Sequence, residues 1–136
     1  MANVVLVDSS VWIDHFNGAV NPPVEWLRAA LEDGEGDILC GDLITQEVLQ
    51  GFRLDKHFSQ AERALALFPC VTLGGRENCI AAATMYRRMR QRGITIRKPV
   101  DVLIAAFCIH EKIPLLHNDR DFNPISVHCG LRVVDL

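Results

Sequence analysis

Four acidic side chains stand at positions from which they could act together. Asp8 directly follows a predicted strand, and Glu47 lies one turn into a short predicted helix after the next strand. Asp101 lies in the first turn of a strongly apolar predicted helix, and Asp119 follows a late predicted strand. Strand ends and helix N-termini meet at one edge of a parallel sheet, so we expect the four carboxylates to gather there.

Gathered carboxylates indicate a bound cation. They repel one another and lose hydration, which destabilises a fold unless a positive charge compensates. Carboxylate oxygens with few competing histidines or cysteines favour Mg²⁺, with Mn²⁺ as a possible substitute. One or two such ions can bind a phosphodiester, activate water and stabilise the departing oxygen, so no side-chain nucleophile is needed. Ser10, beside Asp8, could hold a metal-bound water or a phosphate.

Each acid also has an ordinary structural explanation. Asp8 could cap a helix, and Asp101 could answer a helix dipole. Asp119 could be a turn residue, and Glu47 could be solvated. The joint placement of all four, rather than any one of them, is what predicts a site.

The elements that must position these acids alternate along the chain. This alternation predicts one α/β domain over residues 1–136 with a mainly parallel central sheet. The predicted strands are Val4–Val7, Asp37–Cys40, Cys70–Leu73, Leu115–Leu116 and Leu131–Val134. The predicted helices are Val11–Phe16, Val24–Glu32, Ile44–Gly51, Ser59–Phe68, Glu77–Arg92 and Pro99–His110.

The net charge of the chain is −3, but its positive charge is concentrated in one place. Residues 87–98, the basic band, carry six positive charges and no acid, which leaves −9 on the rest of the chain. A basic band beside acidic, metal-binding residues suits a polyanion that must approach carboxylates, although a solvated helix face would give the same pattern. The band consists of Arg87, Arg88, Arg90, Arg92, Arg97 and Lys98.

Four motifs together resemble the PIN domain, in its VapC toxin branch. They are VDSSVWI at 7–13, ITQEVLQG at 44–51, PVDVLIAA at 99–106 and HNDRDF at 117–122. Each motif alone is weak, but the four occur in the right order and at the right intervals over nearly the whole chain. The resemblance implies a PIN-like three-layer α/β/α fold. The segment 55–77 carries no usable motif, so it says nothing about partners.

The resemblance also implies a Mg²⁺-dependent endoribonuclease, the toxin of a type II VapBC-type toxin–antitoxin system. Members of this branch typically cut structured RNA such as tRNA, form homodimers and are inhibited by a VapB-type antitoxin. The implied catalytic residues are Asp8, Glu47, Asp101 and Asp119. Of these, Asp8, Asp101 and Asp119 are the predicted metal ligands, with Ser10 and Asp121 in supporting positions. The predicted RNA contacts are Arg87, Arg88, Arg90, Arg92 and Lys98.

Two other functions fit parts of the sequence. One is an aspartate-based phosphoryl-transfer protein, because an apolar strand ends at Asp8. Against it, a phosphatase of this kind would have an acid where Ser10 stands, and a receiver domain would have a lysine near His117. The other is a non-catalytic RNA- or partner-binding module on the same fold. The complete acidic set disfavours that module. A catalytic role for His117 is a weaker possibility than packing.

The cysteines and the apolar stretches indicate a cytoplasmic protein without a membrane segment. The five cysteines are odd in number and lack C-x-x-C spacing, so we expect buried, reduced side chains rather than a zinc site or disulfides. The longest apolar runs, such as Val102–Ile109, are too short to span a bilayer. The sequence does not open with a basic region and cleavage site, so we expect no signal peptide.

Overall fold

The strand β1 (Val4–Val7) lies at the centre of a parallel sheet in this computed structural model, which describes residues 4–34 and 37–136. The sheet has four strands in the order β3-β2-β1-β4. β1 pairs with β2 (Asp37–Gly41) on one side and with β4 (Leu115–Leu116) on the other. β3 (Cys70–Val71) pairs with the other edge of β2. The β-branched and leucine side chains of β1 suit this position, because both faces of the strand are covered.

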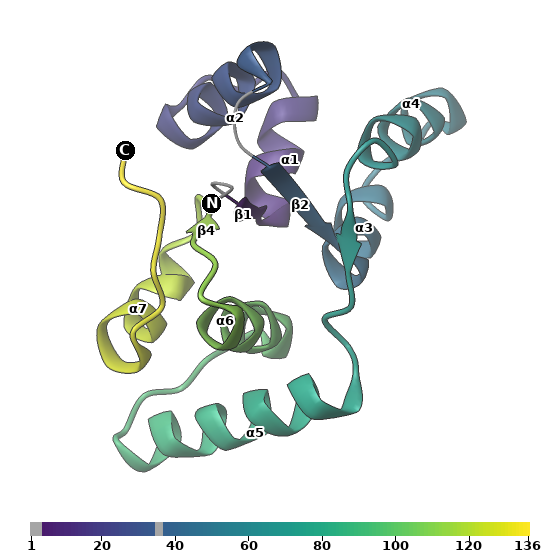
Figure 1. Ribbon diagram of the computed structural model, residues 1–136. Helices are drawn as coiled ribbons and strands as arrows, with labels where there is room; N and C mark the ends of the chain where they lie inside the picture. The colour runs from purple at the N-terminus through teal and green to yellow at the C-terminus, as the bar shows by residue number, and fades with distance from the viewer. Residues whose placement is uncertain (1–3, 35–36) are drawn as a thin grey trace.

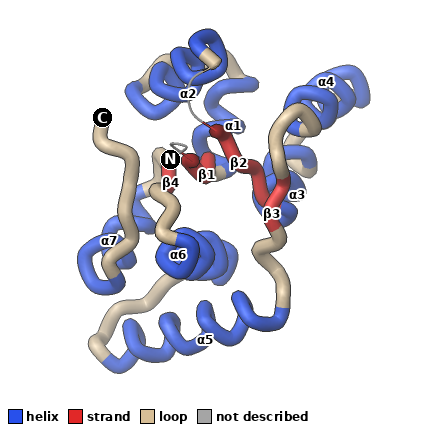
Figure 2. The backbone as a smooth tube through the Cα atoms, viewed as in Figure 1, coloured by secondary structure: helices blue, strands red, loops and turns tan. Residues whose placement is uncertain are grey.

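Helices cover both faces of the sheet, which gives the predicted three-layer α/β/α architecture (Figures 1 and 2). α1 contacts α2 and α3, and α3 contacts α4, whereas α6 contacts α5 and α7 on the other side. None of the helices described is long and apolar enough to cross a membrane. The helices are α1 (Ser9–Phe16), α2 (Pro22–Asp33), α3 (Asp42–Leu49), α4 (Asp55–Leu65), α5 (Arg76–Gln91), α6 (Pro99–Glu111) and α7 (Asn123–Cys129), with a 3₁₀ turn η1 (Arg120–Phe122).

The helix α6 forms much of the core on its side of the sheet. Its sequence is apolar nearly all round, as expected for a central helix, and Ile104 and Ala105 are fully buried. Pro99 occupies the start of the helix, where its fixed φ and missing N–H cost least. Lys98 precedes it in an extended conformation. The sequence thus defines where α6 begins, and this fixes the position of Asp101 in its first turn.

The C-terminal segment differs from the prediction. The expected strand Leu131–Val134 is extended chain that forms only an isolated parallel bridge between Val133 and Leu115 among the described residues. The helix α7 was not predicted, because it is only seven residues long and has no side-chain cap. α4 begins at Asp55 rather than Ser59 and ends at Leu65, because the residues up to Pro69 form a turn instead of continuing the helix.

The prediction of buried cysteines is correct for only two of the five. Cys40 and Cys108 are buried, whereas Cys129 is half-buried and Cys70 and Cys79 are exposed. Cys79 lies on the solvent face of α5, and Cys70 lies on the short edge strand β3, so apolar sequence neighbours do not imply burial there. All five are free thiols, as expected.

Asn78 connects α5 to its neighbours. Its side-chain Nδ2 donates to the carbonyl oxygen of Leu73 at 2.8 Å and to that of Leu103, in α6, at 2.9 Å. One amide group thus satisfies two backbone acceptors in different segments. Such bonds position α5 against α6, and α6 in turn carries Asp101.

We predict that Asn78→Ala lowers the free energy of unfolding by about 1–3 kcal/mol, because two partly buried carbonyls lose their donor. Alanine is the better helix former, so intrinsic propensity acts in the opposite direction. Thr84→Ala on the exposed face of the same helix is the control, since its hydroxyl bonds only within α5. Urea denaturation of both variants measures the effect, and equal unfolding midpoints would contradict the structural role of Asn78.

Candidate active site

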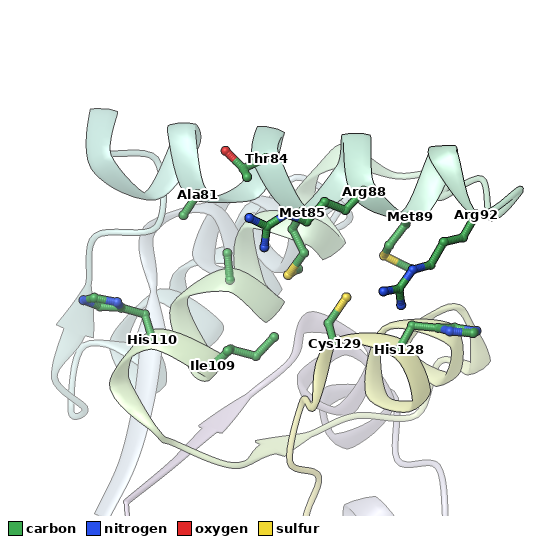
Figure 3. A pocket seen from close by; sticks show the side chains of 11 residues that line it. Ala81, Thr84, Met85, Arg88, Met89, Arg92, Ile109, His110, His128 and Cys129 are labelled. Atoms are coloured by element: carbon green, nitrogen blue, oxygen red, sulfur yellow. The ribbon is translucent and has the colours of Figure 1, made fainter.

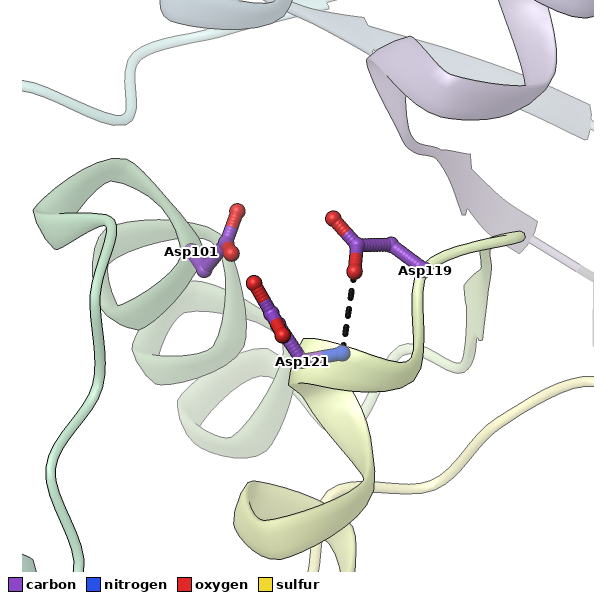
Figure 4. A group of neighbouring side chains, drawn as sticks. All are labelled: Asp101, Asp119 and Asp121. Atoms are coloured by element: carbon purple, nitrogen blue, oxygen red, sulfur yellow. Dashed lines mark hydrogen bonds between the residues drawn. The ribbon is translucent and has the colours of Figure 1, made fainter.

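Three aspartates form a compact group at the end of the sheet. Asp101, Asp119 and Asp121 each offer a carboxylate oxygen, and these oxygens lie within 4.8 Å of one another. Figure 4 shows Asp101 projecting from α6 toward the other two, which come from the segment after β4. The backbone N–H of Asp121 donates to Oδ1 of Asp119 at 2.9 Å, which fixes that carboxylate. We call these three residues the acidic trio.

Of the three aspartates, Asp101 has the least favourable environment for a charged carboxylate. The residue is 3% exposed, and its buried Oδ2 has no hydrogen-bond partner among the described residues. Burial raises the pKa of Asp101 to about 7, and the negative charges of Asp8, Asp119 and Glu47 act in the same direction. An unsatisfied buried carboxylate oxygen is costly unless a cation faces it.

Asp8 lies beside the trio at the end of β1. Its Oδ2 accepts from the backbone N–H of Ser10 at 3.0 Å and from the Ser10 hydroxyl at 2.6 Å, so Asp8 caps α1. The Ser10 hydroxyl oxygen also accepts from the backbone N–H of Asn118 at 3.0 Å. This links the first strand end to the segment that carries Asp119. Burial raises the pKa of Asp8, although the bonds from Ser10 oppose the shift.

Glu47 reaches the same region from α3. The Ser9 hydroxyl donates to Oε1 of Glu47 at 3.1 Å, which ties α3 to the start of α1. Burial raises the pKa of Glu47, and the charges of Asp8 and Asp119 add to the effect. Ser9 was not predicted as a site residue. The sequence signal that could have identified Ser9 is its place directly after Asp8. The structure adds that this polar side chain is buried in the first turn of α1.

Two residues of the basic band pair with the trio. The Lys98 ammonium lies 2.5 Å from Oδ2 of Asp119 and 3.6 Å from Oδ2 of Asp101. The Arg97 guanidinium lies 3.1 Å from Oδ1 of Asp121. Partial burial acts to raise the pKa of Asp119, but the bonds from Lys98 and from the Asp121 amide bring it below its ordinary value.

Four arginines, three in the last turns of α5 and one at its C-cap, surround the end of that helix rather than forming one flat face. Arg88 and Arg92 line a cavity of about 540 Å³ between α5, α6 and α7, with Met89 in its wall (Figure 3). Arg87 lines a different cavity that also contacts Pro99. The Arg90 guanidinium lies 5.7 Å from the centre of the Tyr86 ring. The predicted basic band is thus divided between the acidic trio and the surface of α5.

The structure therefore places the four predicted acids at one end of the sheet, but only two of them belong to the acidic trio. Asp101 and Asp119 belong to the trio together with Asp121. Asp8 and Glu47 lie outside this trio, although their charges act on Asp101. His117 packs against Phe122, with ring centres 4.9 Å apart, and its Nδ1 accepts from the Asp119 amide. These are the contacts of a packed residue.

We predict that ionisation of Asp101 destabilises the metal-free protein. Folding raises the pKa of Asp101 from an ordinary value of 3.8 to about 7, so the unfolded chain releases this proton at lower pH. The stability that the protonated carboxyl contributes is complete below about pH 4 and is lost as the pH rises through about 7. Ionisation of Asp8 and of Glu47 also lowers the stability of the metal-free protein, because folding raises their pKa values too.

Urea denaturation of the wild type and Asp101→Asn between pH 4 and pH 8 in chelator checks this prediction. The variant cannot ionise at position 101, so its stability relative to the wild type should increase with pH. A difference between the two proteins that stays constant across this range would contradict the raised pKa of Asp101.

The family of the chain follows from comparison with known proteins. A model of the PIN domain matches residues 5–127. A VapC ribonuclease of Mycobacterium bovis is 29% identical over 123 residues, which cover 90% of this chain and 92% of that protein. Ribonuclease VapC11 of Mycobacterium tuberculosis has the same identity and coverage.

Solved structures share the fold over nearly the full length. VapBC2 from Rickettsia felis, bound to a promoter DNA fragment, has a TM-score of 0.76 at 14% identity and covers 98% of both chains. FitAcB from Neisseria gonorrhoeae has a TM-score of 0.72 at 16% identity and covers 96% of both. VapC20 of Mycobacterium tuberculosis, described as a sarcin–ricin loop cleaving toxin, has a TM-score of 0.67 at 15% identity, covering 96% of this chain and 98% of that one.

The family model spans the β1 end, α3, α6 and the segment after β4, and so includes every acid placed at this end of the sheet. The chain belongs to the PIN domain family.

Proposed function

We propose that this chain is a metal-dependent endoribonuclease and the toxin of a VapBC-type toxin–antitoxin system. The observation that carries the proposal is the buried Oδ2 of Asp101 within the acidic trio, which has no hydrogen-bond donor among the described residues and has the Lys98 ammonium 3.6 Å away. The pKa of Asp101 is raised to about 7 despite that ammonium, so one lysine offsets the buried charge only in part, and a divalent cation would offset it more fully. The similar proteins named as VapC ribonucleases support RNA as the substrate.

The acidic trio has the donors that a hard divalent ion requires. Its ligand atoms are carboxylate oxygens, which favour Mg²⁺, with Mn²⁺ as a substitute. Asp101, Asp119 and Asp121 would hold the ion, with Asp8 as a further ligand close by. When bound, Mg²⁺ would supply Lewis acidity that polarises the phosphodiester and activates water.

The surrounding residues position the reacting groups. Glu47 would accept the proton of the attacking water, because its pKa is raised toward the range of a useful general base. Ser9 would orient Glu47 through its 3.1 Å hydrogen bond. Ser10 would hold Asp8 and the Asn118 backbone in a fixed relation, so that the strand-end acids keep their spacing.

The substrate we propose is structured RNA such as tRNA, approached through the basic band. The exposed arginines at the end of α5 would contact phosphates outside the acidic centre and so offset the repulsion between RNA and the carboxylates. The shape of a folded RNA would be recognised by such distributed contacts rather than by base edges in a helix groove.

The partners we propose are a VapB-type antitoxin and a second copy of this chain. The support for the antitoxin is that several proteins with this fold were solved as toxin–antitoxin assemblies, including VapBC2 and a complex from Klebsiella pneumoniae. The second copy is the homodimer that the resemblance to the VapC branch implies. An antitoxin-free preparation is therefore the right material for testing activity.

We predict that Asp101→Asn lowers metal-dependent cleavage of total tRNA by about 10²-fold or more, because the site loses one of its charged ligands. The variant should remain folded, since a neutral amide relieves charge repulsion in the metal-free protein. Asp33→Asn, at the exposed end of α2, is the matched control and should keep full activity. Fragments are measured on gels with Mg²⁺, with Mn²⁺ and with chelator.

Discrete fragments that require metal and disappear in Asp101→Asn would support the proposal. Full activity in the folded variant would overturn the assignment of the acidic site. Failure of wild-type protein to cut tRNA or other structured RNA would favour the non-catalytic binding module. A trapped phospho-aspartate would favour phosphoryl transfer instead.

We predict that Arg87→Gln, Arg88→Gln and Arg90→Gln together weaken RNA binding and reduce its dependence on salt. Each lost phosphate contact should reduce the slope of log affinity against log salt by about 0.7–0.9. The control combines Arg53→Gln, Lys56→Gln and Arg63→Gln, which remove the same charge from exposed positions outside α5. Binding is measured with cleavage-deficient Asp101→Asn protein. Equal slopes for the two triple variants would mean that the arginines of α5 make no specific contact.

A further inference from the structure

The Lys98 ammonium lies between two members of the acidic trio. It is 2.5 Å from Oδ2 of Asp119 and 3.6 Å from Oδ2 of Asp101. The second of these oxygens is the buried one that has no hydrogen-bond partner in the part of the chain that the structure describes. A positive charge of this chain therefore stands at the oxygens where a divalent ion would bind.

The backbone sets Lys98 at this position, whereas its side chain stays free to leave. Lys98 directly precedes the first helical residue, Pro99, so its Cα lies at the N-terminal end of α6 beside Asp101. The Lys98 side chain is 49% exposed, and rotation about four of its bonds can move the ammonium. Rotation about those bonds would move the charge into solvent without any change in α6.

We propose that Lys98 is an internal counter-ion that holds the acidic trio together in the metal-free protein and is displaced when a divalent ion binds. This inference rests on the metal site proposed above. Oδ1 of Asp119 is held by the Asp121 amide, so Lys98 and the ion would compete for Oδ2 of Asp119 and Oδ2 of Asp101. Each cation offsets part of the negative charge of the trio, and both cannot occupy the same place.

The direction in which metal affinity changes when Lys98 is removed distinguishes this role from a merely structural one. A residue that supports a metal site weakens metal binding when it is removed. A residue that competes with the metal strengthens metal binding when it is removed, because the ion no longer has to break an ion pair. Removal of Lys98 should also destabilise the metal-free protein, since the carboxylates lose their counter-charge.

Calorimetric titration of metal-free protein with Mn²⁺ at pH 8 tests the proposal. The proteins are the wild type, Lys98→Met and Arg97→Met, each purified through chelator. Methionine keeps the length of the apolar stem and removes the charge. Arg97→Met removes a neighbouring charge that is paired with the third member of the trio but is 78% exposed. It therefore reports the general effect of one fewer positive charge nearby.

Lys98→Met should bind Mn²⁺ about five- to tenfold more tightly than the wild type, the range of a partly exposed ion pair. Arg97→Met should change the affinity by less than about twofold, because an exposed pair is screened by solvent. In chelator, Lys98→Met should have a lower melting temperature than the wild type. Saturating Mn²⁺ should remove this difference.

Unchanged or weaker Mn²⁺ binding by Lys98→Met, with normal binding by the wild type, would overturn this inference and leave the proposed nuclease standing. An equal gain in Mn²⁺ affinity in Lys98→Met and Arg97→Met would mean that Lys98 acts only through its charge at a distance. That result would overturn the inference as well. If neither the wild type nor Lys98→Met binds Mn²⁺, the metal site itself fails and both proposals fall together.

Discussion

The mutual repulsion of carboxylates at the end of one sheet is the constraint on which the rest of this structure depends. Asp8 and Asp101 are each only 3% exposed, so water does little to screen them. Burial and the neighbouring negative charges raise the pKa of Asp101 to about 7. A domain that places acids in this way must hold them by other interactions, because they would otherwise separate or become protonated.

The fold supplies those interactions from several separate segments. The order β3-β2-β1-β4 brings the ends of β1 and β4 side by side, and the Ser10 hydroxyl then joins them through Asn118. The Ser9 hydroxyl ties α3 to the same end. Lys98 and Arg97 bring positive charge from the segment before α6. Contacts between segments that lie far apart in the sequence therefore help to hold this end of the sheet together.

The sequence predicted the kind of fold and the approximate place of the acids, because both depend on local signals. An apolar strand followed by Asp8, and Pro99 followed by Asp101, are readable from spacing alone. The pairing of Lys98 with Asp119 could not be predicted in the same way, because it joins residues 21 positions apart. For that reason the sequence predicts an RNA surface or a solvated helix face for the basic band, and not the ion pairs of Lys98 and Arg97 with the acidic trio. The helix α7 was missed because its short sequence carries no cap signal.

The burial of α6 on nearly all sides has a consequence for how the site can adapt. Asp101 is attached to a helix whose Ile104 and Ala105 are fully enclosed, so its carboxylate has little room to shift. Asp119 and Asp121 are attached to a short turn that leads into a seven-residue helix near the surface. In the metal site proposed above, the Asp101 carboxylate would thus be held more tightly than those of Asp119 and Asp121, whose side chains are 22% and 20% exposed. We expect ions of different radius to be accommodated by small shifts of these two side chains, so that discrimination by size would be decided there and not at α6.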